Sequence, residues 1–311
     1  MHIVAVRLTT FCVLLFCICG NVYAVGERLI DAVMRSDFVF DRDISNVPFF
    51  PLGYLNVSHQ SSIEIGNETG ECQFDSCEFQ YQSASQGLGL PFWVGKKNMF
   101  ILGESLESDR LSSHGDSIQV NSAGLLGAWV IQPSEQWQAG SFAYIYSGFG
   151  DNNLATDPTG SVLGAVARYR HKETFHSYWG LIHYNANGDS QLYPYAGFDW
   201  YIGKAWSVSA VFPWPTVSYA PSKSRIYKLG ATYSSTDWSM SDNGQVQNNG
   251  FQKWDVGFAV EQKLSGVIWG AVSFGYSGLG KLTIQSDGDL HYDENIQNEP
   301  FLRMSINLRP E

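Results

Sequence analysis

The sequence lacks an apolar run long enough to form a transmembrane helix beyond its first residues. After residue 24, the longest near-continuous apolar stretch is GLLGAWVI, Gly124–Ile131, whereas a membrane-spanning helix needs about 20 such residues. Helical amphipathic spacing is also scarce, with one candidate at Glu27–Met34. These absences exclude a helical membrane protein and favour β-structure.

Basic residues are also few. The chain has 19 Lys and Arg against 30 Asp and Glu, and no stretch gathers the cations into a stripe. Because nucleic acids and anionic partners are bound through clustered Lys and Arg, the sequence predicts no nucleic-acid partner.

The first 24 residues have the pattern of a secretory signal peptide. Arg7 supplies the positive charge, FCVLLFCIC (Phe11–Cys19) the apolar core, and VYA the small residues before a cleavage site at Ala24. We therefore predict a cleaved signal peptide at 1–24. Its removal takes one cation from the 19 and leaves 18 basic side chains against 30 acidic ones.

Cysteine is nearly absent after the signal peptide. Three of the five cysteines lie within it, and the remaining pair is Cys72 and Cys77 in GECQFDSCEF. An exported protein meets an oxidising compartment, and no histidine stands nearby to complete a zinc site. We predict a disulfide between Cys72 and Cys77, with free or metal-bound thiols as the alternative.

The rest of the chain is rich in aromatic residues that alternate with small or polar ones. In LYPYAGFDWYI, Leu192–Ile202, every second residue is apolar, and the same period of two recurs along the chain. This period is typical of strands with one apolar and one polar face. The expected strands are Tyr54–Ile65, Glu78–Trp93, Met99–Leu106, Ser117–Ile131, Trp137–Gly148, Ser161–Arg170, Phe175–Tyr184, Leu192–Ile202, Ala205–Phe212, Arg225–Ser234, Phe251–Leu264, Val267–Leu279 and Phe301–Leu308.

The connections between these strands alternate between short and long. GKKN, QPSEQ and RHKET are short, whereas GFGDNNLATDPTG and IQSDGDLHYDENIQNEP are long. Outer-membrane barrels have short periplasmic turns and long outer loops, with aromatic girdles at both interfaces. Tryptophans near strand ends fit such girdles: Trp93, Trp137, Trp206, Trp238, Trp254 and Trp269. We predict an all-β, antiparallel, up-and-down transmembrane β-barrel; a secreted soluble β-sandwich is the alternative.

The strand number depends on the segment around two prolines. Thirteen strands are odd, whereas single-chain bacterial barrels have even numbers. Because proline is confined to strand ends and turns, the chain must bend at Pro213–Pro215 in FPWPTVSYA. A hairpin there gives fourteen strands; leaving Tyr54–Ile65 outside the wall, or merging two segments, gives twelve. We expect about twelve, with 10–14 possible, because TVSYA is short for a crossing of about 9–11 residues.

The middle of the chain resembles a family of uncharacterised exported barrels of Gram-negative bacteria. The resemblance rests on GFDW, WSVSAVFPWPTVSYAPSKS and YKLGATY, between about Tyr193 and Tyr233. It implies an outer-membrane β-barrel and no activity. Terminal aromatic residues usually mark barrels for the assembly machinery, whereas this chain ends in INLRPE.

A barrel directs the charged face of each strand inward. The domains expected are the signal peptide 1–24, a periplasmic or plug-like segment 25–48 and the barrel 49–311. The function expected is a channel or passive transporter, with a closed structural or surface-interaction barrel as the alternative. The candidate lumen-lining residues are Arg168, Arg170, Asp199, Lys228, Lys253, Asp255 and Glu261.

Catalytic and metal-binding patterns are weak. Ser112, Ser113, His114 and Asp116 are adjacent in a loop, but a catalytic triad requires groups that converge in space. His171, His176 and His183 flank a turn. A lipid-modifying enzyme using His114 or His183 is a third hypothesis; we expect no enzyme and no cofactor.

One acidic loop could bind a cation or the lipopolysaccharide layer. DGDLHYDENIQNE contains Asp287, Asp289 and Asp293, and carboxylate oxygens are suitable Ca²⁺ ligands. A plain solvated loop is the simpler interpretation. The expected location is the outer membrane of a Gram-negative bacterium, and the expected partners are its lipid, lipopolysaccharide and the barrel assembly machinery.

Overall fold

The computed structural model describes residues 38, 44–48, 51–64, 78–113, 116–150, 159–186, 189–242, 245–286 and 289–309. Within these ranges, no helix is both long enough and apolar enough to cross a membrane. The strands are β1 (Gly53–Glu64), β2 (Glu78–Val94), β3 (Asn98–Ser113), β4 (Asp116–Ile131), β5 (Trp137–Gly150), β6 (Thr159–Lys172), β7 (Phe175–Ala186), β8 (Asp189–Ile202), β9 (Trp206–Ser209), β10 (Thr216–Ser222), β11 (Arg225–Asp242), β12 (Gln245–Ser265), β13 (Ile268–Ser286), β14 (Asp289–Ile296) and β15 (Glu299–Leu308).

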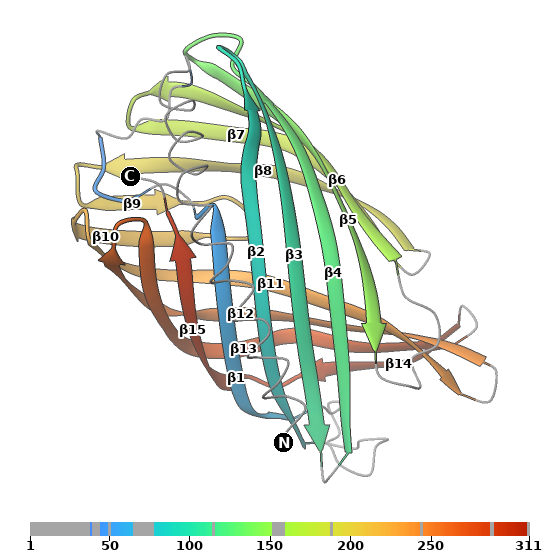
Figure 1. Ribbon diagram of the computed structural model, residues 1–311. Coiled ribbons are helices and arrows are strands. Elements are labelled where there is room, and N and C mark those ends of the chain that lie inside the picture. Colours follow the sequence, from blue (N-terminus) through green and yellow to red (C-terminus); the bar gives the residue numbers. More distant parts are fainter. Residues whose placement is uncertain are drawn as a thin grey trace.

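The strands form one closed antiparallel barrel (Figure 1). Each strand from β1 to β13 pairs with its neighbours in sequence, and β15 closes the wall by pairing with both β13 and β1. β14 pairs with Gly280–Ser286 and β15 with Ile268–Ser277, so the two share one position beside β13. The fifteen strands therefore occupy fourteen positions, which confirms the all-β barrel and corrects the preferred count of twelve.

Two features bring the count to fourteen. The segment expected at Tyr54–Ile65 lies in the wall as β1, between β15 and β2. The residues after Pro215 form a strand of their own, β10, which pairs with the expected strand β9; β9 and β10 are both short. Their hairpin turns at Pro213 and Pro215, where the sequence required a bend, and a turn bond runs from Trp214 N to Val211 O at 2.8 Å. The expectation of twelve assumed that every strand crosses the whole wall. β9 and β10 do not, since each pairs only with the nearest parts of its neighbours.

The barrel has two different ends. At one end, called the turn end, short connections join the strands at 95–97, 132–136, 173–174, 203–205, 223–224 and 266–267. The opposite end is called the loop end; most of its connections lie outside the described residues. The short connections at the turn end are those that the sequence predicts. The expectation of long loops at the other end is wrong in part, because the stretch IQSDGDLHYDENIQNEP contains the end of β13, the whole of β14 and the start of β15.

The outer face of the wall is apolar. Leu125, Ile145, Leu181 and Phe274 are more than half exposed, on strands spread around the barrel. Aromatic residues gather near the turn end: Trp93, Trp129, Trp137, Trp179 and Trp206 are each 40–50% exposed. Such a belt with an aromatic girdle is typical of a transmembrane barrel.

One predicted girdle residue, Trp269, does not face outward. It is only 3% exposed and packs inside the barrel with Ala220 and Ile226. The prediction for Trp269 is therefore wrong, because its place at a strand end gives its height in the wall and not its face. The side chain of Trp238 lies outside the described part of the chain.

In the described part of the outer belt, the carboxylate of Glu104 lies within the apolar face of β3. Glu104 shares its face with Leu102 and Leu106, and its register partners are Leu88 and Leu125. Charged side chains on the lipid face of a barrel are destabilising. We expect Glu104→Leu to raise the free energy of unfolding by about 1–2 kcal/mol, measured by urea titration in lipid vesicles.

Two variants serve as controls for this prediction. Glu104→Gln removes the charge but keeps a polar group, so it should give a smaller gain. Glu135→Leu, in the exposed 132–136 turn, should leave stability unchanged. A Glu104→Leu protein less stable than wild type would mean that the carboxylate has a stabilising partner.

Candidate functional site: the barrel interior

Contacts between strands that are not neighbours identify the inner face. The hydroxyl of Thr236 on β11 donates to Asp109 on β3 at 2.9 Å, and the rings of Tyr81 on β2 and Phe251 on β12 are 5.4 Å apart. Because these strands do not pair in the wall, the contacts must cross the interior. The alternating residues that share these faces therefore point inward.

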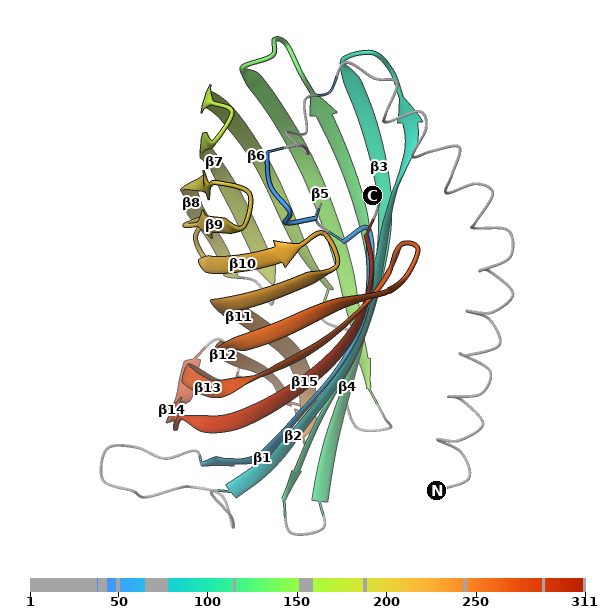
Figure 2. The same ribbon diagram turned by 90° about the vertical axis from the view of Figure 1, so that its left-hand side faces the viewer.

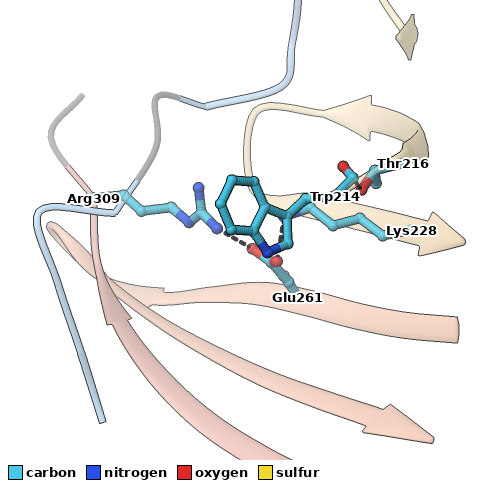
Figure 3. Close-up of polar contacts among 5 residues, drawn as sticks. All are labelled: Trp214, Thr216, Lys228, Glu261 and Arg309. Atoms are coloured by element: carbon cyan, nitrogen blue, oxygen red, sulfur yellow. Dashed lines mark hydrogen bonds and ion pairs between the residues drawn. The ribbon is translucent and has the colours of Figure 1, made fainter. Parts of the chain in front are cut away.

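Glu261 holds two cations at the turn end, a group called the Glu261 cluster. Lys228 Nζ lies 2.5 Å from Glu261 Oε1, and Arg309 Nη2 lies 2.8 Å from Oε2 (Figure 3). Both carboxylate oxygens are thus engaged by cations from β11 and from the residue after β15. Burial of the Glu261 and Arg309 side chains, 7% and 6% exposed, shields these pairs from water.

Asp255 forms a second group, the Asp255 cluster, with cations on both sides. Lys253 Nζ is 3.3 Å from Asp255 Oδ1, and Arg303 donates to Oδ2. Ser277 adds a hydroxyl donor to Oδ1 at 2.5 Å. Since the side chains of Lys253 and Asp255 are only 4% and 2% exposed, the charges depend on one another.

The other predicted lumen residues lie on β6 and β8. Arg168 donates to Gln138 at 2.8 Å, and Tyr178 donates to Asp199 at 2.5 Å. Arg170 lies 3.6 Å from Glu173 in the adjoining turn. Arg168 and Arg170 share the inward parity of β6, as Asp199 does on β8. The structure thus places all seven candidates on inner faces; their role in permeation stays a prediction.

The turn end is lined by a small apolar cluster and by part of the N-terminal segment. Ala220, Ile226 and Trp269 pack together, and Val47 lies against them. Asn46 N donates to Lys204 O at 2.7 Å, and its side chain donates to Ala220 O at 3.0 Å. The described part of the predicted segment 25–48 therefore docks on β10 and the 203–205 turn.

Nearer the loop end, an apolar cluster narrows the interior. We call this cluster the constriction; it joins strands β2, β3 and β4 to β12, β13 and β14. Its members are all buried and carry inward-facing side chains: Tyr81, Leu111, Val120, Phe251, Leu282 and Ile296. Lys253 Nζ lies 4.4 Å from the centre of the Tyr81 ring, which connects the constriction to the Asp255 cluster.

The weaker candidates are placed as follows. His183 Nε2 lies 2.7 Å from Ser190 Oγ on the outer face, and His171 Nε2 lies 2.8 Å from Ser177 Oγ. His176 is fully buried on the inner face. Within the described ranges no carboxylate is bonded to His183, so a triad is not assembled there and the expectation of no enzyme stays a prediction.

Several predicted positions fall outside the described residues. These are Cys72, Cys77, His114 and Asp287, together with the side chains of Ser113, Asp116, Asp289 and Asp293. Among the described residues, no group of three or more His, Cys, Asp or Glu is arranged to hold a metal ion. The disulfide and the calcium site stay predictions.

No family model and no curated protein sequence matches this chain. Among solved structures, it is similar to the COG4313 outer membrane channel from Pseudomonas putida F1, at 12% identity and TM-score 0.43, covering 86% of this chain and 100% of that one. The P. putida toluene transporter TodX is 8% identical, with TM-score 0.39 and coverage of 85% and 91%. The KdgM porin in complex with disordered oligogalacturonate is 8% identical, with TM-score 0.36 and coverage of 82% and 98%.

These neighbours are outer-membrane barrels, and their likeness concerns architecture alone. The resemblance to a family of uncharacterised exported barrels, seen in the sequence, stays a prediction.

Proposed function

We propose that the protein is a channel or passive transporter in the outer membrane. The observation that carries this proposal is the distribution of charge: ionisable groups line the inside of a closed barrel whose outer face is an apolar belt. Buried charges of this kind are costly to place, and an interior that served only for packing would be filled by apolar side chains. A polar interior supports the passage of solutes.

A closed structural barrel is the second candidate, and the constriction favours it. Tyr81 and Phe251 are 4% and 1% exposed, so their contact leaves little free space between β2 and β12. The two candidates differ in one measurable property, which is conductance.

We expect discrete conductance steps from the refolded protein in planar lipid bilayers. Phe251→Val should increase the size of the steps, because it removes most of a ring that lies across the interior. Phe274→Val is the matched control, since Phe274 is on the outer face and is 53% exposed. A protein that inserts without any steps, in both the wild-type and Phe251→Val forms, would favour the closed barrel.

The cellular setting follows from the same proposal. The signal sequence, the apolar belt and the aromatic girdle support export to the outer membrane of a Gram-negative bacterium. Outer-membrane lipid, lipopolysaccharide and the barrel assembly machinery are the partners that such a barrel requires. This setting is tested by fractionating two kinds of cells, which express either the wild-type chain or a chain that cannot be cleaved at Ala24. The wild-type protein should be found in the outer-membrane fraction.

A further inference from the structure

The ring of paired strands is closed at the turn end, but the wall is incomplete between β8 and β11 towards the loop end. On one side, the final backbone bonds to β8 come from the residues that follow β9. They run from Ala210 N to Phe198 O at 2.8 Å and from Phe212 N to Ala196 O at 3.4 Å. β11 last contacts β10 through Ala231 N and Pro215 O at 3.0 Å. Beyond these bonds, β8 continues to Asp189 and β11 to Asp242, and within the described residues no strand pairs with their facing edges.

Figures 1 and 2 show the cause of this gap: β9 and β10 are short arrows between two long strands. The sequence is adapted to it. Backbone groups of alternate residues point to the same side of a strand, so Pro194 follows Ala196 and Phe198 in facing the gap. Proline has no N–H, and it is tolerated on edges that lack a neighbouring strand.

The gap lies at the height of the apolar belt. Pro194 is the register partner of Leu181, which is 54% exposed on the outer face. On the other side, Ala231 is the register partner of Val256, which is 46% exposed. The membrane is therefore in contact with this part of the wall, where unpaired backbone groups would be strongly unfavourable against lipid alone.

Aromatic and polar side chains border the gap. At its turn-end side, the Phe212 and Trp254 rings are 5.9 Å apart, and Trp254 is 5.5 Å from Tyr233. At its loop-end side, Tyr184 donates to Asp237 across the gap, and its hydroxyl lies 2.9 Å from that of Tyr146. The gap is thus bounded on all sides: β8, β11, the tip of the β9–β10 hairpin and the Tyr184–Asp237 bridge.

We propose that this gap is a lateral window between the barrel interior and the membrane, used by small aromatic molecules that carry a hydrogen-bonding group. The rings of the border offer stacking contacts, and the Tyr hydroxyls and unpaired backbone groups offer hydrogen bonds. This inference rests on the proposed channel function and specifies its route and its substrate class.

The window itself can be tested without transport. In protein carrying Cys72→Ser and Cys77→Ser, bimane attached at Tyr193→Cys, on the inward parity of β8, should be quenched both by brominated lipid chains and by aqueous iodide. The same label at Tyr144→Cys is the control, because its strand β5 is paired on both sides. An unquenched label at position 193 in brominated lipid would show that the wall is closed.

The substrate class can be tested with N-phenyl-1-naphthylamine, an aromatic amine that fluoresces on entering a membrane. In cells with an intact lipopolysaccharide leaflet, the protein should speed its entry. Tyr233→Arg places a cation at the window, so entry should slow by about tenfold or more. Tyr276→Arg, on a fully paired part of the outer face, should leave the entry rate unchanged.

The outcomes separate this inference from the channel function. Conductance without faster entry of the amine overturns the window and leaves the channel. Equal slowing by Tyr233→Arg and Tyr276→Arg also overturns the window. If the wild-type protein shows neither conductance nor faster entry of the amine, both proposals are overturned.

Discussion

Replacing Asp255 by alanine should lower the free energy of unfolding by about 3–5 kcal/mol. Asp255 is the only described carboxylate that touches both Lys253 and Arg303, and it also accepts from Ser277. Its removal leaves a nearly fully buried ammonium group without its ion-pair partner. Breaking a buried pair is more damaging than never having formed it, because the remaining charge stays desolvated. Urea titration of the barrel in vesicles, followed by tryptophan fluorescence, measures the loss.

Two controls separate this effect from general damage to the wall. Lys253→Met combined with Asp255→Leu removes both charges and should recover much of the lost stability. Glu173→Ala breaks a pair with Arg170 from its exposed side, since the Glu173 side chain is 72% exposed, and should change stability by about 1 kcal/mol or less. An Asp255→Ala protein as stable as the Glu173→Ala protein would mean that water reaches the Asp255 cluster.

The wall of the barrel could be predicted from the sequence because its pattern is local. Alternation in Leu192–Ile202 and in the other segments gives the face of each residue, and a closed barrel repeats this rule around its circumference. The same rule gave the seven inward candidates, since each stands one residue away from an outward apolar side chain. The girdle assignment of Trp269 was wrong because it used the position at a strand end and not this rule; Trp269 has the inward parity and fills the turn end.

The groups inside the barrel could not be predicted, because they depend on which strands face one another across the interior. Thr236 and Asp109 are 127 residues apart in the chain, and nothing in the local pattern pairs them. The constriction was missed for a related reason. Tyr81, Leu111 and Phe251 have the inward parity, at which polar residues were expected. A run of apolar residues at inward positions near several strand ends was the available signal.

The strand number depended on a feature that is visible in the sequence but has two structural interpretations. Pro213 and Pro215 indicated a bend, and the choice between twelve and fourteen strands then depended on whether a short strand may stand in the wall. β9 and β10 do so because they pair only where β8 and β11 are nearest to the turn end. Because β9 and β10 are short, the wall is incomplete beyond their ends. This incomplete wall is what suggests the lateral window.

Replacing Gly275 by valine should prevent the barrel from reaching its native stability, with a loss of about 3 kcal/mol or more. A Cβ at Gly275 would lie 2.1 Å from Val256 O and 2.5 Å from the Cα of Gly257, its register partner on β12. These are backbone atoms in a paired strand, so the wall itself would have to separate. Gly127→Val is the matched control, because a Cβ at Gly127 meets nothing within 4 Å. Heat-modifiable migration on gels reports folding, and a Gly275→Val barrel as resistant to urea as the Gly127→Val barrel would show that β12 and β13 can separate there without loss.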